Sequence, residues 1–164
     1  MASESSASQF RFEKRRAAAI VTIVGGEAVR GSFFTAAGDT RHHGGERIGD
    51  LLNSDSGFFP FEIDAETSPR TVLYNRAHVI TVALFDDEAK RDAGYSVARR
   101  RQVAIVLSNG QRLRGVVPIY CPEGRDRLSD WTRQPERFRY VETADATFIV
   151  NADHIVAITE ATES

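Results

Sequence analysis

The chain has 164 residues, of which 41% are hydrophobic and 27% are charged, and its formal net charge at pH 7 is −2. This length suits one ordinary domain or two small ones, and the near-neutral charge excludes a global basic field that would attract nucleic acid or anionic lipid. The single cysteine, Cys121, excludes an internal disulfide framework and a cysteine-rich zinc site.

The N-terminal segment contains a basic stretch, EKRR, followed by the apolar run AAAIVTIV. This order has the outline of a signal peptide, but VAIVLSNG repeats the apolar pattern deep in the chain, where no targeting signal lies. We therefore interpret the run as the first strand of a domain and expect residues 1–15 to be flexible. No apolar run approaches the ~20 residues needed to cross a bilayer, so a cytoplasmic protein without membrane contact is expected.

The strand pattern continues through the first half of the chain. Apolar residues alternate from residue 19 to residue 23 before Gly25-Gly26, which predicts a strand ending in a two-residue hairpin turn. The return strand runs through VRGSFF, where Gly31 is expected to mark a bend or a bulge. RIGDLL predicts a short helical turn whose first backbone N–H groups are capped by Asp. Strand-forming residues on both sides of Asn75 predict a second hairpin with its turn at NRAH.

The same succession of patterns returns in the second half of the chain. VTIVGGEAVRG (Val21–Gly31) aligns without a gap with IVLSNGQRLRG (Ile105–Gly115), RIGDLL aligns with RLSDWT, and VLYNRAHVITV aligns with FIVNADHIVAI. The register offsets are 84, 80 and 76 residues, so the extra residues of the first copy fall in two loops. Three ordered blocks indicate an internal duplication. The predicted organisation is a first repeat at 16–85, a linker at 86–98, a second repeat at 99–160 and a tail at 161–164.

Each copy is expected to form an all-β unit of about five short strands and one helical turn, which removes its exposed edges by curling into a small barrel. The succession of a strand, NG, LRG, a loop with RLSD and the strand FIVNADHIVAI resembles Sm-like and SH3-like small β-barrels. It is also similar to uncharacterised bacterial domains with an R-L-S-D block before an N-x-x-H-I strand. The resemblance covers nearly all of the second copy and most of the first. It implies a tandem duplication of a five-stranded barrel, and RNA binding as in Sm-like proteins.

Polar residues that recur between the copies form a repeat signature. Its members are Arg47, Asp50, Asn75, His78, Asn151 and His154. An Asp and a His brought together could orient a catalytic nucleophile, yet no Ser, Cys or Lys recurs beside them in both copies. The structural alternative is that each Asn holds an Asx turn while each His bonds a neighbouring backbone group. We therefore expect no catalytic residue and no enzymatic activity.

A second candidate site surrounds the single tryptophan. Its residues are Arg127, Asp130, Trp131, Arg133 and Arg137. Arg and Trp are favoured anchors of interfaces, so this stretch predicts a surface for an anion or for a protein partner. The alternative is a tryptophan in the core beneath an exposed, arginine-rich turn.

Two further features provide alternative functions. Basic residues cluster at 11–16 and 99–101, and a surface built from both clusters would contact the phosphates of RNA. Nearby acidic residues favour a solvated face of mixed charge instead. His42 and His43 are adjacent, and with a neighbouring carboxylate they could form part of a metal site. The alternative is an exposed loop.

Together these features predict a non-enzymatic binding or scaffold protein made of two fused small barrels. Its expected partner is another protein or a second copy of the chain. RNA binding through the arginine clusters is the first alternative, and a metal-dependent site at the His42-His43 loop is the second. The sequence assigns no cofactor, no metal ligands and no small-molecule substrate.

Overall fold

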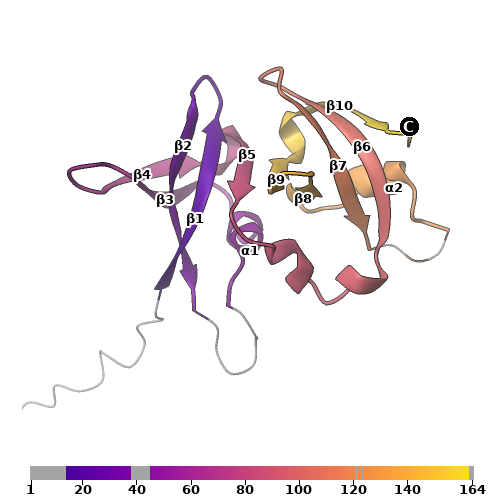
Figure 1. The fold of residues 1–164 in the computed structure, drawn as a ribbon, viewed down its shortest axis with the longest axis horizontal. Helices are drawn as coiled ribbons and strands as arrows, with labels where there is room; N and C mark the ends of the chain where they lie inside the picture. Colours follow the sequence, from indigo (N-terminus) through magenta and orange to yellow (C-terminus); the bar gives the residue numbers. More distant parts are fainter. Residues whose placement is uncertain (1–13, 38–44, 121, 123, 163–164) are drawn as a thin grey trace, which may run out of the picture.

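The computed structural model describes residues 14–37, 45–120, 122 and 124–162. These residues form a mainly β protein in which ten strands build one antiparallel sheet (Figure 1), so the all-β class is confirmed. In these ranges no helix has the length and apolar character that a membrane span requires. The expectations for residues 1–13, for the His42-His43 loop and for Cys121 lie outside the described residues.

Two sets of five strands follow each other along the chain, and each set has the same succession of elements. The first set is β1 (Lys14–Ile23), β2 (Ala28–Ala36), β3 (Phe58–Ile63), β4 (Arg70–Asn75) and β5 (Val79–Leu84). The second set is β6 (Arg99–Leu107), β7 (Arg112–Ile119), β8 (Phe138–Glu142), β9 (Thr147–Asn151) and β10 (Ile155–Glu160). We refer to residues 14–84 as the N-terminal half and to residues 99–160 as the C-terminal half.

Short helical elements occupy corresponding places in the two halves. Before β3 and β8 lie the helices α1 (Ile48–Asn53) and α2 (Leu128–Thr132). Before β5 and β10 lie the 3₁₀ turns η1 (Arg76–His78) and η4 (Ala152–His154). Two more 3₁₀ turns, η2 (Glu88–Arg91) and η3 (Tyr95–Val97), connect β5 to β6.

The pairing register also repeats between the halves. The strand order is β10-β6-β7-β8-β9-β5-β1-β2-β3-β4, so each half supplies five adjacent strands. Residues that face each other in one half correspond, by the sequence offsets, to residues that face each other in the other half. Examples are Val21–Val29 with Ile105–Leu113, Val21–Val82 with Ile105–Ile158, and Ser32–Glu62 with Val116–Glu142.

The segments NRAH and NADH are corners of the chain and not hairpin turns. β4 pairs with β3 and β5 pairs with β1, so the hairpin expected around Asn75 is wrong. η1 instead carries the chain from one side of the N-terminal half to the other, and η4 does the same in the C-terminal half. The apolar residues flanking Asn75 correctly indicate two strands, but local pattern does not determine which neighbours those strands pair with.

Neither half is closed by its own strands. Among the described residues no pairing joins β4 to β5 or β9 to β10, and the expected closed barrels are not confirmed. β5 and β9 instead pair with each other and lie side by side between the halves (Figure 1). The result is one open sheet that ends on β4 and β10.

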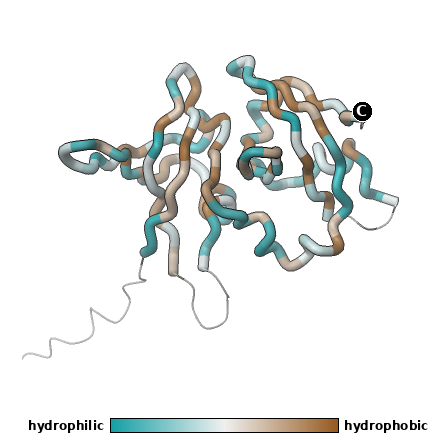
Figure 2. Tube along the Cα trace, in the orientation of Figure 1, coloured by the Kyte–Doolittle hydropathy of each residue, from teal (hydrophilic) through white to brown (hydrophobic). Residues whose placement is uncertain are grey.

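Each half surrounds its own hydrophobic core, and the strands of both halves contain the hydrophobic segments of the chain (Figure 2). In the N-terminal core Phe33 stacks on Phe59, with 5.3 Å between ring centroids, and meets the ring of Phe61 edge-on at 5.2 Å. In the C-terminal core the largest buried side chain is Trp131. The two cores are thus built from different residue types on the same strand framework.

Gly31 and Gly115 lie where neighbouring strands approach closely. The register of β1 with β2 passes Gly31 without a shift, and that of β6 with β7 passes Gly115 in the same way, so the expected bulge is wrong. A Cβ atom at Gly31 would collide with the carbonyl oxygen of Glu62 and the ring of Phe61. A Cβ atom at Gly115 would lie 2.5 Å from the carbonyl oxygen of Glu142. Glycine is required here because β3 and β8 leave no space for a side chain.

Replacing Gly31 by Ala should destabilise the fold, because the added methyl group meets a strand backbone that cannot move alone. We expect Gly31→Ala to lower the free energy of unfolding by about 1–3 kcal/mol, as measured by urea denaturation. The control is Gly26→Ala, since Gly26 has no positive φ and the nearest atom to an added Cβ lies 3.8 Å away. We expect a change within about 0.5 kcal/mol for this control. Equal losses in both variants would contradict the close approach as the cause.

Candidate functional site

The repeated R-x-x-D blocks cap the two short helices. Asp50 Oδ2 accepts the backbone N–H of Arg47 at 3.1 Å, and Asp130 Oδ2 accepts that of the exposed Arg127 at the same distance. In the first helix the Arg47 guanidinium also pairs with Asp50, with 2.8 Å between nitrogen and oxygen. The capping role expected for these aspartates is confirmed, and it accounts for their recurrence without catalysis.

The two asparagines of the signature cap the 3₁₀ corners. Asn75 Oδ1 accepts the N–H of Ala77, and Asn151 Oδ1 accepts that of Asp153, both at 3.0 Å. The Asx-turn interpretation is therefore confirmed. It explains why Asn begins each corner, because a short side-chain acceptor satisfies an N–H that the turn leaves open.

The two histidines lie in equivalent corners with different surroundings. His154 Nδ1 lies 2.8 Å from Ser108 Oγ, and His154 Nε2 lies 2.8 Å from the carbonyl oxygen of Ala77, which belongs to the other half. His78 ends the corresponding turn and is exposed. The backbone bond expected for the histidines is thus present for His154 and connects the two halves.

The arginine-rich stretch around Trp131 divides into a buried and an exposed part. Trp131 is buried, and the Arg139 guanidinium lies over its ring at 4.8 Å. The indole is therefore part of the core, as the structural alternative expects, and is not accessible as an interface anchor. Arg133 and Arg137 are exposed, and Arg137 pairs with Asp153 at 3.1 Å.

Two arginines whose role was not predicted from the sequence satisfy the C-terminal ends of the helices. Arg139 donates to the carbonyl groups of Trp131 and Gln134. Arg76 donates to the carbonyl oxygen of Leu51 at 3.1 Å. Leu51 and Trp131 are equivalent positions, whereas Arg76 and Arg139 are not. The end of each helix thus receives hydrogen-bond donors from a different element, η1 for α1 and β8 for α2.

The two halves are joined where β5 pairs with β9. The paired residues are Thr81–Val150, Val82–Ile149, Ala83–Phe148 and Leu84–Thr147. Both strands are buried along nearly their whole length. This junction therefore covers one open strand edge of each half and converts ten strands into a single sheet.

Polar side chains fix the register of the junction. The wholly buried Asn151 donates through Nδ2 to the carbonyl oxygen of Val79 at 2.9 Å, and lies 3.4 Å from that of Arg76. Asn53, at the end of α1, bonds both backbone groups of Phe138: it donates to the carbonyl oxygen at 2.8 Å and accepts the N–H at 2.9 Å. Both contacts pass from one half to the other, so a slipped register would leave buried polar groups unpaired.

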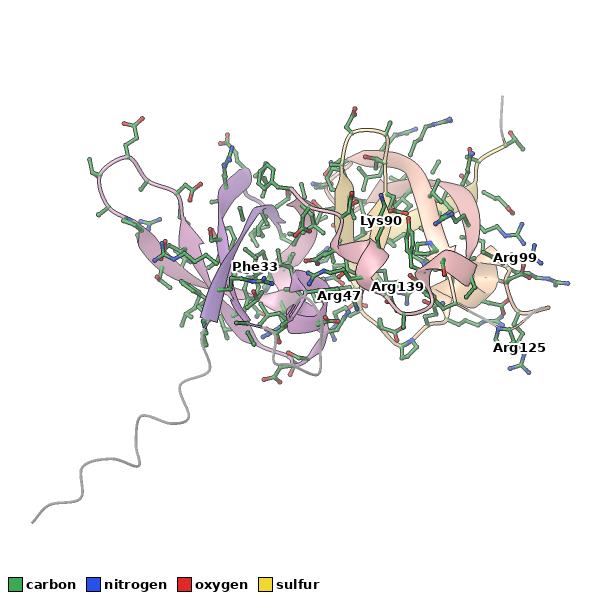
Figure 3. All side chains as sticks on the ribbon, turned by 60° about the horizontal axis from the view of Figure 1, so that its bottom comes forward. Phe33, Arg47, Lys90, Arg99, Arg125 and Arg139 are labelled. Carbon is green, nitrogen blue, oxygen red and sulfur yellow. The ribbon has the colours of Figure 1, made fainter. Side chains whose placement is uncertain are left out.

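The connecting segment adds a buried carboxylate to the junction. Glu88 in η2 accepts the N–H groups of Ile48 and Gly49, each at 3.0 Å. The hydroxyl of Tyr140, from the C-terminal half, donates to Glu88 Oε1 at 2.9 Å. Arg47 lies over the Tyr140 ring at 5.5 Å and occupies the space between the halves (Figure 3). Burial raises the pKa of both Glu88 and Tyr140.

Apolar side chains cross the junction in both directions. Ile80, on β5, belongs to the core of the C-terminal half. Phe138 and Ile149, from the C-terminal half, are buried in the core of the N-terminal half. Each half therefore completes its core with side chains of the other half, and the junction is a packed interface as well as a strand pairing.

The free ends of the sheet carry large exposed apolar side chains. Leu73 on β4, and Phe58, which lies opposite Asn75 of β4, are each 64% exposed. Val156 on β10 is 68% exposed. Single exposed apolar residues are ordinary, but Leu73 and Val156 lie on the two edge strands and Phe58 lies beside one of them, and edge strands bind other strands readily. We call β4 with Phe58 the β4 edge, and the open side of β10 the β10 edge; together they form the candidate functional site.

A groove of about 570 Å³ between α1 and α2 is the main concave feature near the junction. Its lining includes Arg47, Asp50, Tyr120 and Tyr140. Burial raises the pKa of Tyr120 to about 12, so this phenol is neutral near pH 7. The lining offers hydrogen bonds and aromatic surface to a ligand, but Arg47 already pairs with Asp50 and Asp92. Within the described ranges, no cluster of His, Cys, Asp and Glu is suited to holding a metal ion.

Among the described arginines of the two basic clusters, Arg16, Arg99 and Arg101 pair with carboxylates, whereas Arg100 lies over the Tyr95 ring at 4.7 Å. Arg99 and Arg101 each approach Asp126 at 3.5 Å, and Arg16 pairs with Glu62 at 3.2 Å. Arg99 lies toward the outer end of the C-terminal half, far from Arg47 (Figure 3). These contacts fit the solvated face of mixed charge.

The edge residues were not found from the sequence, because exposure depends on which strands are neighbours. Leu73 and Val156 align with residues that the junction buries, so the alignment gives no sign that their surroundings differ. One local signal was present. The run Val72-Leu73-Tyr74 places apolar side chains on both faces of β4, which is typical of a strand covered on both sides.

Asn151 and Asn75 allow a direct test of the junction. Replacement by Asp keeps the oxygen that caps each turn but removes the Nδ2 donor. Asn151→Asp should lower the free energy of unfolding by at least about 2 kcal/mol, because a carboxylate then faces two buried carbonyl oxygens. Asn75→Asp, in the equivalent turn at the open edge, should change it by no more than about 0.5 kcal/mol in dilute solution. Similar losses in urea denaturation would contradict the specific role of Asn151.

Glu88 makes a testable contribution to the pH dependence of stability. Because burial raises its folded-state pKa above the ordinary 4.5, the folded state holds the proton more tightly than the unfolded state. The free energy of unfolding of the wild type, relative to Glu88→Gln, should therefore fall as the pH rises from about 4.5 through the folded-state pKa, and then level off. Urea denaturation of both proteins across this range measures the difference. A difference that rises with pH would refute the assignment.

Comparison with known protein families, curated proteins and solved structures finds no match to this chain. We therefore infer the function from the geometry of the junction and of the two free edges.

Proposed function

We propose that this chain is a non-enzymatic binding and scaffold protein, built from two copies of a five-stranded unit of the SH3-like or Sm-like type. It acts through protein–protein contacts at its free strand edges. The observation that carries the proposal is the exposure of Phe58, Leu73 and Val156 on the β4 and β10 edges.

The matched architecture of the halves supports the repeat. Both halves have strand, strand, helix, two strands, 3₁₀ corner and strand in one order, and their paired residues correspond at the sequence offsets. Asn75 and Asn151 cap the same turn in the same way. A five-stranded antiparallel unit of this length falls in the range of small barrels. The pairing of β5 with β9 gives each unit a neighbour where a single barrel would have to close on itself.

The edges lack the features by which proteins usually protect open strands. Such strands are commonly short, interrupted by proline or studded with charges. In β4 the only charged residue is Arg70, at its start, and in β10 it is Glu160, at its end. The central residues of both strands are apolar or neutral. Open backbone groups between apolar side chains suit the addition of a strand from a partner.

The polar signature residues support a non-enzymatic role. Asp50, Asn75 and Asn151 hold backbone N–H groups at helix and turn starts. His154 bonds Ser108 and the backbone of the other half. Asp50 and His154, which could serve as acid or base, are thereby engaged in holding the fold, and no recurring nucleophile accompanies them.

Affinity capture from cells that naturally make the protein tests this function. We expect the same proteins to be captured by the wild type and by Val97→Lys, because Val97 is 84% exposed but lies in η3, outside the sheet. Val156→Lys and Leu73→Lys each place a charge on one edge and should lose at least part of that set. If both edge variants capture what the wild type captures, the edges are not the binding sites and the proposed function is wrong.

A further inference from the structure

The β5–β9 junction shows how two edges of this protein pair. β5 and β10 are the last strands of their halves, and β4 and β9 are the penultimate strands. The junction joins a last strand to a penultimate strand. The sheet ends on one last strand, β10, and on one penultimate strand, β4, and each of these two strands has one free edge. The two free edges are thus of the same two kinds that pair inside the molecule.

Equivalent residues differ sharply in exposure where the neighbouring half is missing. Those of the junction are buried, and their counterparts on the free edges are open to solvent. The pairs are Ile80 and Val156 (1% and 68% exposed), Ile149 and Leu73 (0% and 64%), and Phe138 and Phe58 (2% and 64%).

These three pairs include the side chains that cross the junction. Ile80 enters the core of the C-terminal half, while Phe138 and Ile149 enter the core of the N-terminal half. By contrast, Ile158 and Tyr74 face the core of their own half and are partly buried. The strands at the free edges therefore pack normally within their own half, and only the neighbouring half is missing.

We infer that copies of this chain associate head to tail, with the β10 edge of one copy paired antiparallel with the β4 edge of the next. This inference rests on the proposed function and names a second copy of the chain as the partner. The internal register, transferred to this contact, pairs Ala157 with Tyr74, Ile158 with Leu73, Thr159 with Val72 and Glu160 with Thr71.

The transferred contact completes both cores at the ends of the molecule. Val156, at the position of Ile80, enters the N-terminal core of the next copy. Phe58 and Leu73 of that copy enter the C-terminal core of the first. The exchange of side chains is the one that the junction already shows.

Asn75 supplies the matching polar contact. At the junction Asn151 caps its own turn through Oδ1 and holds the carbonyl of Val79 through Nδ2. Asn75 caps its own turn through Oδ1 in the same way. In the head-to-tail contact its Nδ2 group faces the carbonyl of Ile155, the counterpart of Val79.

Two other polar contacts of the junction have no counterpart at the free edges. Pro60 stands at the position of Tyr140, so the hydroxyl that bonds Glu88 is missing. Arg133 stands at the position of Asn53, which bonds both backbone groups of its partner residue. The contact between copies is therefore weaker than the internal junction, and association is reversible and depends on concentration.

The contact joins unlike edges, so a pair of copies still presents one free edge of each kind. Heterologous contacts of this type continue until a ring closes, or extend as a filament when the rotation between copies does not close. A two-fold dimer built from two β10 edges or two β4 edges is a different assembly, and the experiment below separates it.

Sedimentation velocity of the full chain tests the contact over about a hundredfold range of concentration. The wild type should show species heavier than the 18.2 kDa chain that increase with concentration. Val156→Lys and Leu73→Lys should each raise the dissociation constant by about tenfold or more, because an exposed apolar side chain no longer enters a core. Val97→Lys, the same substitution outside the sheet, should leave association unchanged. Circular dichroism confirms that each variant is folded.

Mixing the two edge variants identifies the pairing. Each variant has one intact edge, so Val156→Lys and Leu73→Lys should be monomeric alone and should form a dimer of twice the chain mass, and nothing larger, when mixed. Asn75→Asp, which keeps the turn cap but loses the donor, should also weaken association while leaving the stability of the isolated chain unchanged.

A wild type that remains at 18.2 kDa throughout overturns the inference. One edge variant that dimerises alone, with no gain on mixing, also overturns it, since contacts are then made between like edges. A monomeric wild type whose edge variants lose a captured protein overturns the head-to-tail contact and leaves the proposed function standing. If Val97→Lys weakens association and the two edge variants do not, both the head-to-tail contact and the proposed function are wrong.

Discussion

The pairing of β5 with β9 is the interaction on which the molecule depends. Without it, each half would keep two open strand edges and would lose apolar side chains from its core, Ile80 on one side and Phe138 with Ile149 on the other. A unit of about 65 residues buries barely enough surface to fold alone. Because the two cores share side chains, we expect the halves to unfold together as one cooperative unit.

The junction is reinforced by contacts that only the connecting segment and α1 provide. Glu88 reaches both helix N–H groups and the Tyr140 hydroxyl, and Asn53 holds the backbone of Phe138. The strand pairing and the apolar side chains that cross the junction define its geometry, whereas these polar contacts stabilise it further. The free edges have the first set of features without the second, which distinguishes the internal junction from the contact that we propose between copies.

Local chemistry was readable from the sequence and long-range pairing was not. The Asx corners at Asn75 and Asn151 and the Asp caps rest on contacts within a few residues, and the structure contains them. The supposed hairpin at Asn75 is wrong because two apolar strands around a turn do not have to pair with each other. The helix-capping role of Arg76 and Arg139 was also missed. The two arginines do not align with each other, so the comparison of the two halves does not reveal that both bond a helix end.

The exposed edge residues stand at the positions of residues that the internal junction buries. For a strand that always faces water, Leu73 or Val156 could be polar without loss, and a charge there would lower the risk of unwanted strand pairing. Asn75 makes the same point by its chemistry. The turn at Asn75 needs only a hydrogen-bond acceptor, which Asp or Ser would also supply. In the equivalent Asn151 the amide group also donates a hydrogen bond to the other half. The β4 edge holds the apolar side chains, the backbone groups and the donor of the internal junction, and it lacks the opposite strand and the contacts that Asn53 and Tyr140 make. Every copy of the chain carries a strand of the missing kind at its other end.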